Sequence, residues 1–100
     1  MERLDLQEQF EKDLFDACRE SMKACGYYPG EFLGRATRMG AVEAARRLLH
    51  ETTPGYYFRS LCDLHRQDLS VEAQVARPEY RTLFTPEEIR TATQRMRAQA

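Results

Sequence analysis

Arginines at helical spacing between residues 31 and 50 are the side chains of this sequence best suited to chemistry, and that chemistry is the binding of an anionic partner. Two short helices are predicted here, over 31–39 and 41–50. They meet at Gly40, and the small residue Ala36 lies four positions before it. A turn glycine and a small residue that lets two helices approach closely are typical of a helix-turn-helix.

In this interpretation the second helix enters a DNA groove. Arg46 or Arg47 would read guanine edges, with His50 on the same side. Arg35 and Arg38, on the first helix, would contact phosphates. These five residues form the candidate face for nucleic acid or for another partner.

Three features weigh against DNA binding. Arg46 stands where the second helix of this motif usually has an apolar core residue. The first turn of that helix offers only Glu43 as a polar group. Residues 26–50 carry four arginines against Glu31 and Glu43, a net charge of only +2. An ordinary helical hairpin with solvated arginines therefore remains an alternative.

A second group of basic residues lies near the C-terminus. This group consists of Arg77, Arg81, Arg90, Arg95 and Arg97. The five arginines and the three glutamates in the same stretch give a net charge of +2. Basic side chains in the last turn of a helix complement its dipole, which would explain Arg95 and Arg97 without a function.

Catalysis has little support in the sequence. Cys62 and His65 are three residues apart and are predicted to meet on one helix face, but no third group to orient them is apparent. Asp68 and Glu72 are explained as a turn cap and a first-turn glutamate. No phosphate loop, dinucleotide fingerprint or serine-hydrolase motif occurs. We expect a protein that is not an enzyme.

The cysteines and histidines do not predict a metal site. Cys18, Cys25 and Cys62 include no Cys-x-x-Cys pair, and their number is odd, which argues against a disulfide scaffold. Only His50 and His65 are left to complete a zinc site, and their spacing is not that of a ligand pair. We expect small buried thiols, with no metal and no cofactor.

Four tyrosines flank the two Pro-Gly breaks: Tyr27, Tyr28, Tyr56 and Tyr57. Packing of helix ends with the hydroxyl groups at the surface is the simpler interpretation. An exposed aromatic groove for a partner is the alternative.

The elements that position these residues are all predicted to be helical. Apolar residues recur every three or four positions in the first stretch, which should bury Leu6, Phe10, Leu14, Cys18, Met22 and Cys25. Asp5 and Gly26 are its start and stop signals. A largely buried helix is expected from Tyr56 to His65, and Asp68 or Ser70 should cap a short one that ends near Ala76.

The last helix has the clearest signal. Thr85-Pro86-Glu87-Glu88 combines an N-cap, a first-turn proline and a capping-box glutamate, and Phe84 with Ile89 fits a hydrophobic staple. No strand pattern is long enough to decide, although Leu69–Glu72 alternates. We therefore predict a compact all-α bundle of five to six short helices, forming one domain over 1–100, with a helix-turn-helix-like hairpin.

Composition sets limits on function. The 100 residues are 42% hydrophobic and 31% charged, with a net charge of −1. A chain dominated by phosphate binding is usually clearly basic. No apolar run approaches the length of a membrane span, and residues 1–5 lack the features of a signal peptide. We expect a cytoplasmic protein that does not enter membranes.

From Tyr27 onward the chain resembles a family of small helical bacterial proteins. The shared residues are Tyr28-Pro29, Phe32-Leu33, Gly40, Ala44-Ala45, Leu48-Leu49, Gly55, Asp68-Leu69-Ser70-Val71-Glu72, Tyr80, Leu83-Phe84-Thr85, Glu88 and Ala92. A Gly-Arg turn that often precedes Asp-Leu in that family is replaced here by His65-Arg66-Gln67. The resemblance implies a bacterial cytoplasmic protein or appended module, in a mobile-element or phage-defence setting, and supplies no catalytic residues.

The sequence thus favours a non-catalytic helical interaction module whose partner is another protein or a second copy of the chain. The alternative is a DNA-binding regulatory protein that uses Arg35, Arg38, Arg46, Arg47 and His50.

Overall fold

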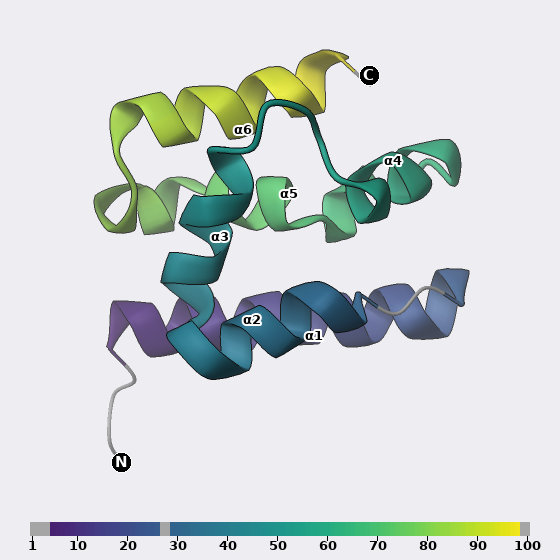
Figure 1. Ribbon diagram of the computed structural model, residues 1–100, viewed down its shortest axis with the longest axis horizontal. Coiled ribbons are helices and arrows are strands. Elements are labelled where there is room, and N and C mark those ends of the chain that lie inside the picture. The colour runs from purple at the N-terminus through teal and green to yellow at the C-terminus, as the bar shows by residue number, and fades with distance from the viewer. Residues whose placement is uncertain (1–4, 27–28, 99–100) are drawn as a thin grey trace.

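A computed structural model describes residues 5–26 and 29–98, and all of its regular elements are helical. In chain order they are α1 (Leu6–Cys25), α2 (Gly30–Met39), α3 (Ala41–Leu49), α4 (Tyr56–Asp63), the 3₁₀-helix η1 (Gln67–Leu69), α5 (Val71–Val75), the 3₁₀-helix η2 (Pro78–Leu83) and α6 (Pro86–Ala98). This confirms the predicted all-α bundle. Figure 1 shows α1 and α2 on one side, α5 and α6 on the other, and α3 crossing between them.

Most helix ends lie at the capping signals in the sequence, although α4 ends at Asp63 and does not reach His65 as expected. The Asp5 carboxylate accepts a hydrogen bond from the Glu8 amide at 2.8 Å and so caps α1. Gly26 ends that helix with a φ of 68°, a left-handed conformation that glycine adopts at little cost. Gly40, with a φ of 92°, separates α2 from α3. Ser70 caps α5, because its hydroxyl accepts from the Ala73 amide at 3.0 Å.

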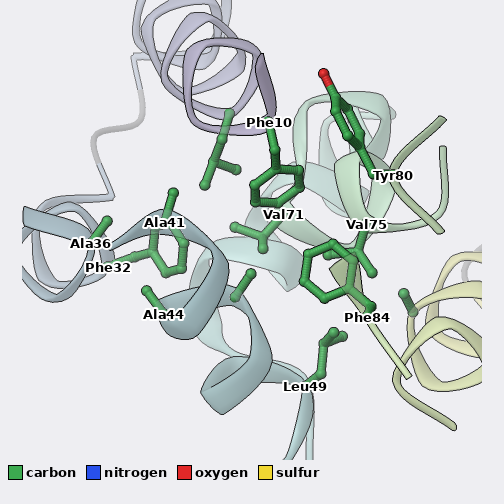
Figure 2. Close-up of a cluster of buried hydrophobic side chains, with 13 residues drawn as sticks. Phe10, Phe32, Ala36, Ala41, Ala44, Leu49, Val71, Val75, Tyr80 and Phe84 are labelled. Atoms are coloured by element: carbon green, nitrogen blue, oxygen red, sulfur yellow. The ribbon is translucent and has the colours of Figure 1, made fainter. Parts of the chain in front are cut away.

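The main core lies where α1, α2, α3, α5, η2 and α6 converge. The rings of Tyr80 and Phe84 both pack edge-on against Phe10, each with a centroid separation of 5.2 Å. Figure 2 shows this aromatic group beside the small side chains of the α2–α3 hairpin. Ala36 and Ala44 are buried there, which permits the close approach of the two helices that the sequence predicted.

Two predicted apolar stripes need correction. Met22 on α1 is 47% exposed, and Ser21 is buried in its place. The hydroxyl of Ser21 donates to the Cys18 carbonyl and accepts from Tyr57, so the fully buried serine is satisfied. The apolar pattern therefore predicted the wrong inward-facing residue in the last turns of α1, where Ser21 faces inward and contacts α4.

The helix from Tyr56 was wrongly expected to be largely buried. Only Phe58 and Leu61 are buried, whereas Tyr56 and Leu64 are exposed to 71% and 49%. Figure 1 shows that α4 lies at one end of the molecule, and its two buried residues, Phe58 and Leu61, lie three positions apart on one face of the helix. The alternating Leu69–Glu72 stretch is not a strand, because Leu69 ends η1, Ser70 is the extended cap residue and Val71 begins α5.

Within the described ranges, no helix has the combination of length and apolar character that spanning a bilayer requires.

Candidate interaction surface

The structure places Arg46 and His50 of α3 against the first turn of α6. Arg46 Nε donates to Glu88 Oε2 at 3.1 Å, and His50 Nε2 lies 2.8 Å from the same oxygen. An ionised carboxylate only accepts hydrogen bonds, so the His50 nitrogen must be the donor in this contact. The Glu88 side chain is only 1% exposed, whereas those of Arg46 and His50 are 43% and 63% exposed, so two partly exposed side chains bind one buried carboxylate on another helix.

Glu88 reaches this position through the capping box of α6. Its Oε1 accepts from the Thr85 amide at 2.9 Å, while its own amide donates to the Thr85 hydroxyl at 3.1 Å. The predicted capping box is thus confirmed, and the second carboxylate oxygen is left for α3. Burial opposes ionisation of Glu88, but the hydrogen bonds from Thr85, His50 and Arg46 outweigh it and lower the pKa of this carboxyl group.

The other three residues of the candidate face have separate surroundings. Arg47 pairs with Glu43 one turn earlier, at 3.2 Å. Arg35 lies between Glu31 and Glu51, at 3.4 and 3.2 Å. Arg38 is exposed, and its side chain has no hydrogen bond or ion pair to residues 5–26 or 29–98.

The positive charges of these arginines are balanced by the carboxylates that pair with them. Four positive charges come from Arg35, Arg38, Arg46 and Arg47, and four negative charges come from the carboxylates that bind three of them: Glu31, Glu43, Glu51 and Glu88. With His50 left aside, the set is formally neutral. Such a surface attracts a phosphate backbone much less than the arginines alone would.

A buried ion pair that the sequence interpretation missed joins α5 to α6. Arg95 Nη1 lies 3.1 Å from Glu72 Oε2, and the two side chains are 8% and 1% exposed. The Arg95 guanidinium also donates to the Leu48 and Glu51 carbonyls, at 3.3 and 2.7 Å. Burial raises the pKa of Glu72, and the hydrogen bond from Arg95 only partly offsets this.

This arrangement corrects the sequence interpretation of Arg95, whereas Glu72 lies in the first turn of α5 as the sequence predicted. Arg95 does not merely complement the dipole of its own helix, because it binds carbonyls at and beyond the C-terminal end of α3. Glu72 is buried, while Asp68 is exposed and pairs with Arg66, so the two carboxylates have separate partners. Arg95 follows Glu88 by seven residues and shares its helical face, a spacing that could have indicated an inward position.

An open groove of about 490 Å³ lies in the described part of the chain. It lies between the start of α2, the end of α3 and the start of α4. Apolar side chains contribute most of its lining, which comprises Gly26, Pro29, Gly30, Glu31, Phe32, Arg35, Leu48, Glu51, Gly55, Tyr56 and Tyr57. We call this recess the α2–α3–α4 groove. A site of this size accommodates a small molecule or one or two large side chains.

The tyrosines at the groove agree in part with both interpretations of the sequence, namely packing of helix ends and an exposed aromatic groove. Tyr56 is 71% exposed at the edge of the groove. Tyr57 is half-buried and donates its hydroxyl to Ser21 at 2.7 Å, which ties the start of α4 to α1. Burial holds the pKa of the Tyr57 phenol well above its usual range. Tyr27 and Tyr28 lie outside the described residues.

A smaller recess of about 290 Å³ lies between α1 and α2, lined by Phe15, Cys18, Arg19, Met22 and Leu33. Its volume is just under the usual range for ligand sites. The α2–α3–α4 groove is therefore the stronger candidate.

The expectation of buried thiols holds for Cys18, whereas Cys25 and Cys62 are half-buried. Cys18, Cys25 and Cys62 are all unpaired, and burial raises the pKa of Cys18 to about 11. Because α4 ends at Asp63 and His65 adopts a φ of 58°, Cys62 and His65 do not share a helical face. In residues 5–26 and 29–98, no three histidine, cysteine or acidic side chains lie close enough together to hold a metal ion.

Comparisons of this chain with models of known protein families, with curated proteins and with solved structures found no match. The resemblance to small helical bacterial proteins thus stays a prediction.

Proposed function

We propose that this chain is a non-catalytic helical module that binds another protein, and that it does so through the α2–α3–α4 groove. The observation that carries the proposal is the groove itself: about 490 Å³, open to solvent, with Phe32 and Leu48 in its lining and the exposed ring of Tyr56 at its edge. Protein interfaces often depend on one large side chain inserted into such a pocket, and tyrosine is enriched at these positions.

The groove is suited to binding because its walls are fixed by the core. Phe32 is buried in the main hydrophobic cluster, and Leu48 packs against that cluster. The Leu48 and Glu51 carbonyls at the end of α3 are held by Arg95. A preformed wall loses little conformational entropy when a partner binds.

DNA binding is the second candidate, because Arg38, Arg47 and His50 are exposed and Arg46 is partly exposed. The pairing of Arg35, Arg46 and Arg47 with carboxylates argues against it, since a phosphate would have to compete with those carboxylates. We therefore favour a protein partner, with a second copy of this chain as one possible form of it.

The proposed setting is the cytoplasm of a bacterium, in a mobile-element or phage-defence system. Support for this comes from the resemblance in residues 27 onward, and the test is the identity of the genes that flank this one. A flanking gene for a nuclease or another defence protein would also name the first partner to assay.

Replacing Tyr56 with alanine should weaken partner binding about tenfold, because it removes the aromatic edge of the groove. The measurement is quantitative affinity capture from the host that encodes this chain, followed by affinity determination for the protein recovered. Leu64→Ala is the matched control, because Leu64 is also an exposed apolar residue at an end of α4 but lies outside the groove lining.

Capture that Leu64→Ala preserves and Tyr56→Ala loses would support the groove. Equal capture by both variants would contradict it, and recovery of this chain alone would identify self-association. A duplex DNA that binds at low salt, with affinity that falls steeply as salt rises, would favour the DNA alternative.

A further inference from the structure

The rim of the α2–α3–α4 groove carries two carboxylates that share one guanidinium. Arg35 Nη1 lies 3.2 Å from Glu51 Oε1, and Arg35 Nη2 lies 3.4 Å from Glu31 Oε1. The Glu31 side chain is 88% exposed and that of Glu51 is 45% exposed, so both carboxylates are open to solvent. One cation between two anions leaves an excess of one negative charge at this rim.

The helix termini at the groove do not cancel this excess. The start of α2 adds about half a positive charge, which the negative C-terminal end of α3 at the same groove offsets. The start of α4 adds a partial positive charge of about half a unit, which is smaller than the full charge of the unmatched carboxylate. A positively charged side chain is therefore the better electrostatic match to the rim.

We propose that the partner segment combines a large apolar side chain, seated against Phe32 and Leu48, with an adjacent lysine or arginine that binds Glu31 and Glu51. This inference rests on the proposed function and adds the chemical class of the partner. The apolar residue supplies most of the affinity, and the cation sets the orientation and the preference among partners.

The test uses two blocked dipeptides, N-acetyl-Trp-Lys-amide and N-acetyl-Trp-Glu-amide, each titrated into the full ¹⁵N-labelled chain at low ionic strength. Both should shift the amide resonances of Phe32, Arg35, Leu48 and Glu51. The lysine peptide should bind about threefold more tightly, in line with an exposed charge pair. Because solvent ions screen exposed charges, the difference should shrink in 0.5 M NaCl.

Matched variants separate the rim from the overall charge of the chain. Glu31→Gln/Glu51→Gln should abolish the preference for lysine. Glu11→Gln/Glu87→Gln removes the same number of charges from exposed sites outside the groove lining and should keep the preference.

The outcomes distinguish this inference from the function on which it rests. Equal affinity of the two peptides, with shifts at the groove, would overturn the cation preference and leave groove binding intact. Preference for the glutamate peptide would reverse the assigned chemistry. Absence of shifts at the groove with both peptides at millimolar concentration would contradict the groove as a binding site and this inference with it.

Discussion

Replacement of Glu72 by methionine should lower the free energy of unfolding by about 3–5 kcal/mol. The reason is that Arg95, which is 8% exposed, would keep its positive charge in the core without a carboxylate. Arginine cannot avoid this cost by losing its proton. Urea unfolding followed by circular dichroism measures the effect, with the wild-type chain as reference.

The double variant Glu72→Met/Arg95→Met gives the control. It removes both buried charges and should recover at least half of the lost stability, because two apolar side chains of similar size can fill the space. Complete recovery is not expected, since the Leu48 and Glu51 carbonyls lose their donor. A double variant no more stable than the single one would show that the penalty does not come from an unpaired charge.

Replacement of Glu88 by alanine should cost about 3 kcal/mol, the second-largest expected effect. The substitution removes the Thr85 amide cap of α6 and the acceptor for Arg46 and His50 on α3. Glu87→Ala is the control, because Glu87 is exposed in the same turn and should change stability by less than about 1 kcal/mol. Equal effects in the two variants would contradict the role of Glu88 as a contact between helices.

The Glu88 contribution should depend on pH. Because the fold lowers the pKa of this carboxyl group below its ordinary 4.5, its contribution is fully present above that pH. It should then be lost as the pH falls through the lower pKa of the folded state. Urea unfolding at a series of pH values should therefore show the difference between wild type and Glu88→Ala shrinking only below pH 4.5. A difference that does not change with pH would contradict an ionised Glu88.

Local signals in the sequence were sufficient for most helix boundaries. Asp5, Gly26, Gly40 and Ser70 each act within a few residues of their own position, so their effect could be predicted without knowledge of the fold. The capping box at Thr85 is of the same kind. Such motifs satisfy backbone groups of their own helix, and this makes them readable from a short stretch of sequence.

Contacts between distant residues could not be predicted in the same way. Glu72 and Arg95 are 23 residues apart, and each has an ordinary explanation as a surface residue near a helix end. Arg46 and Glu88 are 42 residues apart. Periodicity places an arginine on a helical face, but only the packing of α6 on α3 and α5 decides whether that face is buried.

The groove also could not be predicted from the sequence, because it is formed by residues that are distant from one another in the chain. Its lining comes from the starts of α2 and α4 and the end of α3, and these are brought together by the tertiary fold. The sequence did indicate an aromatic groove as one alternative for the tyrosines. It wrongly expected α4 to be largely buried, because apolar residues are frequent all around that helix and the pattern does not reveal that α4 lies at one end of the molecule and buries only Phe58 and Leu61.

The role assigned to Arg46 of α3 is to stabilise the fold by pairing with the buried Glu88 carboxylate, from a side chain that is 43% exposed. Its most direct test is the urea midpoint of Arg46→Ala measured beside that of Arg47→Ala. Arg46 contacts a carboxylate on another helix, whereas Arg47 pairs only within α3, so Arg46→Ala should have a clearly lower midpoint and Arg47→Ala should match wild type. A wild-type midpoint for Arg46→Ala would contradict the account.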